Sequence, residues 1–597
     1  MIGENEFFLG VAKSIRNQSW LDRLSNSRNA LTISQRYGLS EIIGRILAAR
    51  DVGIDEVDVW LNPTLRELMP PPDTVVDLIK GAGRVVEALA NDEQIAIIGD
   101  YDVDGISSTT ILTQFLLAAG AHPLKHIPDR AKEGYGPSIP AVERLVSEGA
   151  KVLITLDCGT ASHGPLARAK ELGLDAIVVD HHQVPEELPQ TFALINPNRN
   201  DDLSGLGNLC AAGVTFMLIA TINKLLREAD WWNDERPAPD LLQSLDLVAL
   251  ATVCDVVPLK GLNRAFVRNG LKVMASRNRT GLTALADIAR LVRAPDVYAL
   301  GFVVGPRLNA AGRIGSAMVG VDLMMETDKG KANQIAAKLE SWNKERQAIE
   351  LGVVDRADYQ AQAEMGQTGN LPAIVVSGES WHPGVLGLAA ARLKERYGRP
   401  SFVLGHPKGS DEASGSGRSI KGVDLGSAVQ AAVKAGIVEK GGGHAMAAGL
   451  TIKIDRIGDL RAFMEDHLRQ KTELARQNQS LKIDAALTAS GATLDLIATI
   501  EKAGPFGAGN PAPMFAFPAH RVVYADIAGA DHVRCTIQAA DGTRLKAIAF
   551  RVADTDLGEL LLTERSMPLH FAGRLAINDW GGKREPQLFI EDVAKVN

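Results

Sequence analysis

Acidic and imidazole side chains recur in short clusters whose spacing suits a metal site. The first cluster is the segment DYDVDG at residues 100–105, which follows the apolar run 95–98 and contains Asp100, Asp102 and Asp104. Side chains two apart on an extended segment point to the same side, so these carboxylates can converge. An EF-hand calcium loop begins similarly, but it needs a preceding helix and a carboxylate at its twelfth position, which here is Ile111. A solvated acidic turn without ligands is the other alternative.

Two further clusters follow the next apolar runs of the chain. Asp157 follows the run 152–156, and the triplet Asp180-His181-His182 follows the run 176–179. Short β-branched runs that alternate with longer amphipathic segments predict an open parallel sheet covered by helices. Such sheets place their functional sites at the carboxyl ends of the strands. We therefore expect the three clusters to meet at one edge of the sheet.

Asp255 is a fourth candidate, because it ends an otherwise apolar helical segment, ALATVCDVVPL. A buried carboxylate without a partner is costly, so this position suggests a cation or a hydrogen-bond network. Taken singly, Asp157 or Asp255 could equally be a helix N-cap or a satisfied buried acid. Together with the other clusters they favour a metal site.

The donor set also indicates the kind of metal. Carboxylate oxygens with one or two imidazoles and no thiolate favour Mn²⁺ or Mg²⁺ over structural zinc. Many carboxylates around a single ion would repel one another, whereas two divalent ions about 3.5–4 Å apart would balance them. One ion would activate a water molecule, and both would stabilise an in-line displacement at phosphorus. The sequence therefore predicts a two-metal phosphoesterase.

Several motifs resemble those of a known family. DYDVDG, LDCG, the literal Asp-His-His triplet and CDVVPL resemble, in this order, the signature motifs of the DHH phosphoesterase family. WHPGVLGLAAARLKERYGRP (from Trp381), SGSGRS (from Ser414) and GGGHAMAAG (from Gly441) resemble its associated second domain. GPFGAGNPAPMF (from Gly504) and LAINDWGGKREPQLFIED (from Leu575) resemble the C-terminal barrel of bacterial exonucleases in this family. The resemblance covers the chain beyond about residue 75.

The resemblance implies an α/β fold of three parts. A parallel-sheet lobe is joined by a long helix to a second α/β lobe, and a β-barrel of the OB-fold type follows. The connector helix is expected where Ile335, Leu339 and Trp342 recur at helical spacing in a Pro-free segment. We predict an N-terminal extension at 1–75, a metal-binding catalytic domain at 76–325, the connector helix at 326–366, a substrate-binding domain at 367–472 and an OB-fold domain at 480–597.

The resemblance also implies roles for individual residues. The expected ligands of two divalent cations, Mn²⁺ or Mg²⁺, are Asp102, Asp104, Asp157, His181 and Asp255. Asp157 would bridge both ions, Asp100 is added to the metal group, and His182 joins the catalytic set as a contact to phosphate. The 5′-terminal phosphate of the substrate would lie at Ser416 and Arg418. The substrate-binding set is completed by Arg307, Asn309, Arg313 and His444.

In function, the resemblance implies an exonuclease that degrades single-stranded DNA from 5′ to 3′ and releases 5′-mononucleotides in DNA repair and recombination. A single-strand DNA-binding protein and a helicase are the partners it suggests. The alternatives are a phosphodiesterase for short oligonucleotides or cyclic dinucleotides, a pyrophosphatase relative, and an inactive replication scaffold. The 597-residue length and the barrel favour a long polymer, and the retained acidic residues argue against a scaffold. In the barrel, Trp580, Phe571 and Phe550 could stack bases or belong to the core.

Composition sets only broad limits on this prediction. The net charge of −8 does not exclude a nucleic-acid substrate, because a cleft can be positive on an acidic molecule. The four scattered cysteines argue against a disulfide framework or zinc ribbon and suit a reducing compartment. The N-terminus lacks a secretory pattern, and the most apolar stretch, 210–222, is too short to cross a bilayer. We expect a cytoplasmic protein without a membrane partner.

Overall fold

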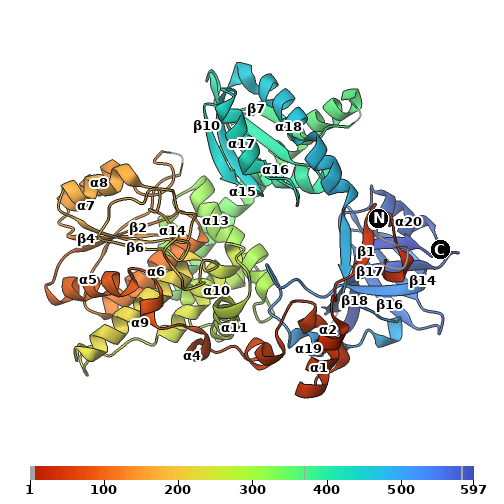
Figure 1. The fold of residues 1–597 in the computed structure, drawn as a ribbon, viewed down its shortest axis with the longest axis horizontal. Helices are drawn as coiled ribbons and strands as arrows, with labels where there is room; N and C mark the ends of the chain where they lie inside the picture. The colour runs from red at the N-terminus through yellow and green to blue at the C-terminus, as the bar shows by residue number, and fades with distance from the viewer. Residues whose placement is uncertain (1–6, 131, 369, 580–582, 597) are drawn as a thin grey trace. The chain divides into compact units, whose positions relative to one another are not determined.

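The computed structural model describes residues 7–130, 132–368, 370–579 and 583–596. The chain forms two compact units, one of residues 65–475 and one that joins residues 1–64 to residues 476–597. Figure 1 shows the red N-terminal strand β1 (Ser19–Asp22) beside the blue C-terminal strands within the second unit. Among the described residues, none of the helices combines the length and apolar character needed to cross a membrane.

A five-stranded parallel sheet is the centre of the first lobe, with the order β3-β2-β4-β5-β6. β2 and β4 are buried along their whole length, which explains their continuous runs of Val, Ile and Leu. The predicted strands at 95–98, 152–156 and 176–179 are confirmed. β3 and β6 have three residues each, too few to leave a pattern in the sequence. The strands are β2 (Ile95–Gly99), β3 (Leu124–His126), β4 (Val152–Leu156), β5 (Asp175–Val179) and β6 (Ala193–Ile195).

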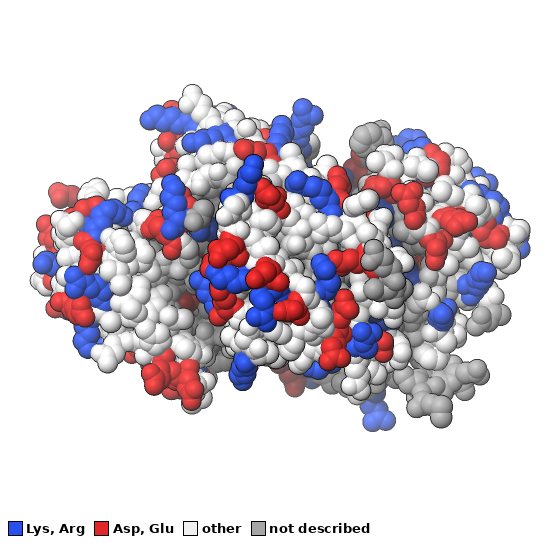
Figure 2. Space-filling model, turned by 90° about the horizontal axis from the view of Figure 1, so that it is seen from above, with Lys and Arg blue, Asp and Glu red and all other residues white. Residues whose placement is uncertain are grey.

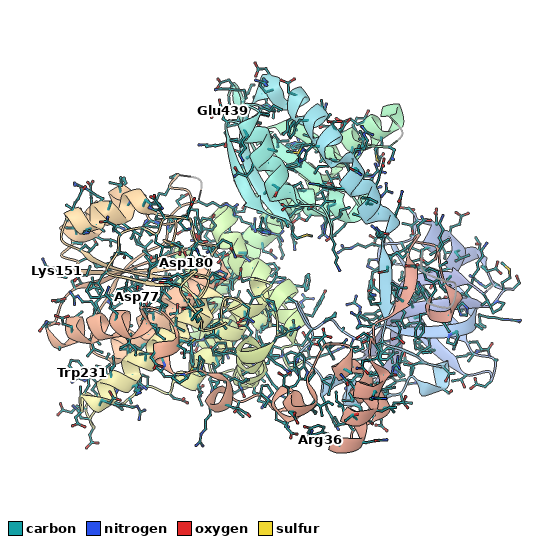
Figure 3. All side chains as sticks on the ribbon, in the orientation of Figure 1. Arg36, Asp77, Lys151, Asp180, Trp231 and Glu439 are labelled. Carbon is teal, nitrogen blue, oxygen red and sulfur yellow. The ribbon has the colours of Figure 1, made fainter. Side chains whose placement is uncertain are left out.

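Helices cover both faces of this sheet. One face packs against α5 (Leu78–Ala90), α6 (Val103–Ala118) and α9 (Ala211–Glu228), and the other against α7 (Ile139–Ser147) and α8 (His163–Glu171). Figure 3 labels Asp180 at the carboxyl end of β5 and Lys151 at the opposite edge, just before β4. The loops after β2, β4 and β5 therefore lie at one edge of the sheet, as the α/β pattern predicted.

A helical segment completes this lobe and leads to the next one. The 40-residue helix α15 (Lys329–Thr368) covers the segment in which the sequence predicted a connector helix. α12 and α13 pack against α15. The other elements are α4 (Leu65–Leu68), α10 (Leu245–Cys254), α11 (Gly261–Ala275), α12 (Thr280–Ile288), the π-helix η6 (Ala299–Val304), α13 (Gly305–Ile314) and α14 (Met318–Met325).

The second lobe contains a mixed sheet with the order β10-β11-β9-β8-β7. β7 and β8 are parallel, and the remaining pairs are antiparallel. Ser416 and Arg418 lie on β9, and His444 ends β10. The elements are β7 (Ile374–Glu379), α16 (Pro383–Tyr397), β8 (Ser401–His406), β9 (Glu412–Arg418), α17 (Leu425–Lys434), β10 (Lys440–His444), β11 (Ala447–Lys453) and α18 (Ile457–Gln477).

The unit formed by both ends of the chain contains a closed β-barrel. Its sheet has the order β13-β14-β15-β16-β18-β17, and β14 also pairs with β17, which closes the ring. The predicted barrel is therefore confirmed. Phe571 is fully buried in its core, Phe550 is 46% exposed, and Trp580 lies outside the described residues. The elements are β12 (Ser480–Ile483), β13 (Ala485–Ala486), α19 (Leu494–Glu501), β14 (Phe515–Ala528), β15 (His532–Gln538), β16 (Arg544–Ala549), α20 (Asp556–Thr563), β17 (Leu569–Asn578) and β18 (Glu585–Lys595).

The N-terminal segment is built into the barrel unit. β1 (Ser19–Asp22) pairs with β12, and the first helices add Ile33, Ile43 and Ile46 to the core around the barrel. The sequence did not indicate this placement, because the partners of these residues lie near the opposite end of the chain. The remaining helices of this segment are α1 (Ser27–Tyr37), α2 (Glu41–Ala48) and α3 (Val57–Leu61).

A buried ion pair ties this segment to the barrel and provides a stability prediction. Arg50 Nη1 lies 2.8 Å from Asp484 Oδ1, and the two side chains are 2% and 1% exposed. We expect Arg50→Ala to lower the free energy of unfolding of this unit by about 3 kcal/mol, because it leaves a buried carboxylate with less compensation. Arg36→Ala is the control, since the Arg36–Asp55 pair is exposed and should contribute less than about 1 kcal/mol. Equal losses in denaturant titrations would contradict this account of the ion pair.

Candidate metal centre

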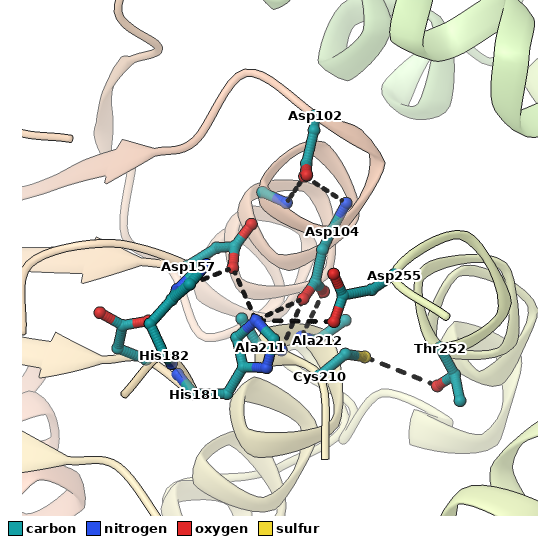
Figure 4. Close-up of polar contacts among 12 residues, drawn as sticks. Asp102, Asp104, Asp157, His181, His182, Cys210, Ala211, Ala212, Thr252 and Asp255 are labelled. Atoms are coloured by element: carbon teal, nitrogen blue, oxygen red, sulfur yellow. Dashed lines mark hydrogen bonds and ion pairs between the residues drawn. The ribbon is translucent and has the colours of Figure 1, made fainter. Parts of the chain in front are cut away.

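Four predicted ligands meet where strands of the first sheet end. Asp104 lies in the first turn of α6 after β2, Asp157 follows β4, His181 follows β5, and Asp255 is the C-cap of α10. His181 Nε2 lies 3.8 Å from Asp104 Oδ2, 3.3 Å from Asp157 Oδ1 and 3.6 Å from Asp255 Oδ2. Figure 4 shows the three carboxylates around this ring nitrogen. The structure thus brings together residues spread over about 150 positions of the chain.

Backbone N–H groups at helix N-termini hold two of the three acidic residues of the first cluster, Asp102 and Asp104. Both carboxylate oxygens of Asp104 accept hydrogen bonds from the start of α9, from Ala211 N–H at 2.6 Å and Ala212 N–H at 2.7 Å. Asp102 is the N-cap of α6, and its Oδ1 accepts from the N–H groups of Asp104 at 2.9 Å and Gly105 at 3.2 Å. A carboxylate oxygen has two lone pairs, so both residues keep capacity for a cation.

Several buried polar atoms of the cluster have no hydrogen-bond partner within the described part of the chain. They are Asp100 Oδ1, Asp157 Oδ1 and His181 Nε2. Asp157 also adopts a left-handed backbone conformation with φ +63°, which is strained for a residue other than glycine. Unpaired buried polar atoms are rare and require an explanation. Acceptor atoms that converge without donors fit a divalent cation.

Electrostatics supports the same conclusion. Burial, followed by the charges of the neighbouring carboxylates, raises the pKa of Asp100 and Asp255 to about 8 and that of Asp104 to about 7. The pKa of Asp157 is raised well above its ordinary value for the same reasons. Buried like charges can remain ionised together only if something compensates them. Divalent cations would supply that compensation.

The two histidines differ in charge. Burial, followed by the positive charge of His182, lowers the pKa of His181 to about 4, so its imidazole is neutral and able to bind a metal. Burial alone would also lower the pKa of His182, but the hydrogen bond and charge of Asp180 outweigh it and raise the pKa to about 9. His182 Nδ1 lies 2.8 Å from Asp180 Oδ1. His182 is therefore a protonated donor at the rim of the cluster.

The possible ligand atoms fall into overlapping groups within the described residues. One group contains Asp104, His181 and Asp255, and another contains Asp100, Asp102 and Asp157; within each group the atoms lie within 4.8 Å of one another. A third joins Asp157 to both histidines. These oxygen and nitrogen donors fit Mn²⁺ or Mg²⁺. The first two groups share no residue, and the third links them because it contains His181 of the one and Asp157 of the other. Two linked groups would suit two neighbouring ions.

The predicted substrate residues on α13 are already engaged in the structure. Arg307 Nε lies 2.7 Å from Glu340 Oε2 on α15, and Arg313 Nη1 donates to Gly384 O at 2.7 Å. Asn309 Oδ1 accepts from Val103 N–H at 3.2 Å and so supports the metal-site loop. These contacts give α13 an organising role between the loop and the second lobe.

On the second lobe, Ser416 and Arg418 lie together. Arg418 Nη1 donates to Ser416 Oγ at 3.1 Å and to Gly417 O at 2.9 Å. Gly387 on α16 leaves room for this pair, because a Cβ there would lie 2.7 Å from Arg418 Nη2. His444 is exposed on another strand, where its Nδ1 accepts from Met446 N–H at 3.3 Å. β11 lies between them, and its residue Ala447 pairs with His444 on one side and with Arg418 on the other.

The structure adds two residues that the sequence analysis did not select. Arg130 lies 5.1 Å from the ring centre of Tyr101, and after burial its charge contributes to lowering the pKa of Arg313 and of Arg418. Tyr135 Oη donates to Asp157 O at 2.8 Å and lies 3.1 Å from His182 Nδ1. A signal was present in the segment RAKEGYG, where an arginine precedes a tyrosine between two glycines.

The basic residues near the metal centre form a small cluster of arginines. On the face seen in Figure 2, acidic and basic side chains are interspersed without a continuous basic stretch. Arg313 interacts electrostatically with Asp102 and with the neighbouring arginines Arg130, Arg346 and Arg418. A cationic cluster beside an acidic one can hold a phosphate while metal ions occupy the acidic part.

Comparison with known proteins agrees with this interpretation of the site. Residues 94–252 match the DHH family N-terminal domain, residues 370–470 match the DHHA1 domain, and residues 483–592 match the RecJ OB domain. The fold and the site thus define a member of the DHH class of metal-dependent hydrolases.

Similarity to individual relatives identifies the family within this class. The chain is 35% identical to the single-stranded-DNA-specific exonuclease RecJ of Dickeya dadantii over 86% of this chain and 91% of that protein. It is 31% identical to the protein of the same name from Haemophilus influenzae, over 96% of this chain and 99% of that protein. The crystal structure of RecJ in complex with Mn²⁺ from Thermus thermophilus is similar with a TM-score of 0.79 and 25% identity, over 96% of this chain and 78% of that one. The chain belongs to the RecJ family.

Proposed function

We propose that this protein is an exonuclease that degrades single-stranded DNA from its 5′ end and releases 5′-mononucleotides. The observation that carries the proposal is the convergence of buried, unpartnered Asp and His atoms at the carboxyl ends of β2, β4 and β5. The relatives over nearly the whole chain are named single-stranded-DNA-specific exonucleases, which supports the substrate.

In this proposal, Asp102, Asp104, Asp157, His181 and Asp255 would hold two divalent cations, Mn²⁺ or Mg²⁺, with Asp100 beside them. Bound cations would supply a water nucleophile at neutral pH and stabilise charge on the phosphate. The chain itself orients these ligands through the N-terminus of α9 and the capped start of α6. Asp180 raises the pKa of His182 to about 9, so its protonated ring would donate a charged hydrogen bond to a phosphate oxygen.

We assign the end preference to three arginines that interact electrostatically, Arg130, Arg313 and Arg418. Ser416 and Arg418, with Arg130 and Arg313, would hold the 5′-terminal phosphate, since clustered guanidinium groups suit a dianionic group. Arg307 and Asn309 would support them from α13, and His444 would contact the strand from β10. A pocket that binds the 5′-terminal phosphate beside the cleavage site would explain why hydrolysis begins at the 5′ end of the strand.

Each domain of the chain would have its own role in this reaction. We assign catalysis to residues 76–325, the connection to 326–366, substrate binding to 367–472 and strand binding to the barrel at 480–597. Recruitment by a single-strand DNA-binding protein or a helicase, and a cytoplasmic location, are further predictions.

The test is digestion of end-labelled DNA by the full chain in Mn²⁺. We expect immediate release of 5′ label as mononucleotide from single strands, delayed release of 3′ label, little cleavage of blunt duplex, and no cleavage with excess EDTA. Hydrolysis of dinucleotides without cleavage of long strands would instead assign the protein to the short-substrate alternative. No hydrolysis of either substrate in Mn²⁺ or Mg²⁺ would favour the scaffold.

A further inference from the structure

Tyr298 and Phe302 form a stacked aromatic pair on the surface of the first unit. Their ring centres lie 5.0 Å apart with an interplanar angle of 24°, and the side chains are 66% and 70% exposed. Large aromatic side chains are normally buried, because their apolar area is unfavourable in water. A preformed and exposed stack suggests a surface that a ligand covers.

The helix that carries the pair packs against an element of the metal centre. Tyr298 is the N-cap of η6 and Phe302 lies within it, and this π-helix contacts α10, whose C-cap is Asp255. Cys254 Sγ is 3.5 Å from Leu300 O, and a Cβ at Gly305 would lie 2.4 Å from Cys254 Sγ. Glycine at 305 therefore permits the close approach of the two helices. Short π-helices are frequent at functional sites.

The segment that carries the pair continues into the rest of the site. η6 runs directly into α13, which carries Arg307, Asn309 and Arg313. On the α10 side, Val256 follows Asp255 and is 70% exposed. The exposed rings are thus held by the same two helices that present Asp255 and the arginines of α13.

We propose that Tyr298 and Phe302 form a stacking platform for an unpaired nucleobase of the DNA strand. This assignment rests on the proposed function and adds a subsite to it. Every base has a π face, so stacking on aromatic rings binds any sequence. In a duplex these faces are covered by neighbouring base pairs, so the platform also favours single strands.

The test distinguishes binding through the bases of the strand from binding through its phosphates. Binding of a 5′-phosphorylated oligothymidylate to the full chain is measured by fluorescence anisotropy in EDTA and compared with a strand of the same length in which internal residues are abasic. We expect Phe302→Ala and Tyr298→Ala to weaken binding of the base-containing strand by about tenfold and to leave the abasic strand unaffected. Phe302→Trp should restore binding, because it keeps a stacking surface.

Tyr359→Ala is the control, since Tyr359 is 76% exposed on α15 and lies outside the proposed site; this variant should bind both strands as the wild type does. An equal loss on both strands, or no loss on either, would overturn the platform; the second result would leave the pair as a protein-docking surface. Digestion of single strands by the wild-type chain in Mn²⁺ tests the proposed function separately, so the two failures are distinguishable.

Discussion

Asp157→Ala should lower the rate of hydrolysis of single-stranded DNA by about 10³-fold or more, while the fold is retained. Asp157 belongs to two of the overlapping ligand groups, so its loss should impair both cation positions. Removal of its charge also relieves repulsion of Asp104, Asp102 and Asp100, the charges that raise its own pKa after burial. The variant should therefore be no less stable than the wild type in metal-free buffer. Mononucleotide release and thermal unfolding measure the two effects.

Stabilisation by Mn²⁺ distinguishes a variant that has lost the metal site from one that has lost its fold. An ion that binds only the folded state stabilises the wild type by about 2.7 kcal/mol at one hundred times its dissociation constant. The Asp157→Ala variant should lose most of this stabilisation. Asp234→Ala, at an exposed position of the same unit, should keep both activity and the response to Mn²⁺. If Asp157→Ala retained full activity, the metal centre would be assigned to the wrong residues.

Arg418→Ala should remove the preference for a 5′-phosphate end. Arg418 Nη1 donates a hydrogen bond to Ser416 Oγ on β9. A charged hydrogen bond to phosphate contributes about 1.5–3 kcal/mol to binding. We expect KM for a 5′-phosphorylated strand to rise roughly 10- to 100-fold, with little change for a strand that begins with a 5′-hydroxyl. Competition between the two strands in one reaction measures this discrimination directly.

Arg392→Ala provides the matched control for the end preference. Arg392 lies on α16 of the same lobe, is 44% exposed and pairs with Glu350 and Glu395. Its removal should leave the ratio of rates on the two strands unchanged. An Arg418 variant that still discriminates like the wild type would exclude this arginine from the end pocket.

The buried strands and the acidic clusters were predictable from sequence, because continuous apolar runs followed by Asp or His leave a strong local pattern. Strands β2, β4 and β5 lie where the runs predicted them. The left-handed backbone of Asp157 and the hydrogen bond from Val103 N–H to Asn309 Oδ1 arise only from tertiary packing. No local pattern could have indicated either one.

Long-range pairing explains the remaining differences. The pairing of β1 with β12 joins opposite ends of the chain, so residues 1–75 carried no recognisable signal. In the barrel, the fully buried Phe571 belongs to the core, which was one of the two alternatives for this residue. Two exposed arginines of the barrel are paired with acids, Arg574 with Glu591 and Arg584 with Asp579 at 3.3 Å, so their charges are partly neutralised. Alternation along a strand predicts burial but does not predict such partners.

Electron paramagnetic resonance of the full chain loaded with Mn²⁺ tests the central claim most directly, together with metal analysis of the same sample. The account predicts two Mn²⁺ ions per chain with the spectrum of a magnetically coupled pair, since ions about 3.5–4 Å apart interact strongly. Asp157→Ala should lose the coupled signal. A single uncoupled ion in the wild type, at saturating Mn²⁺, would contradict the two-metal centre.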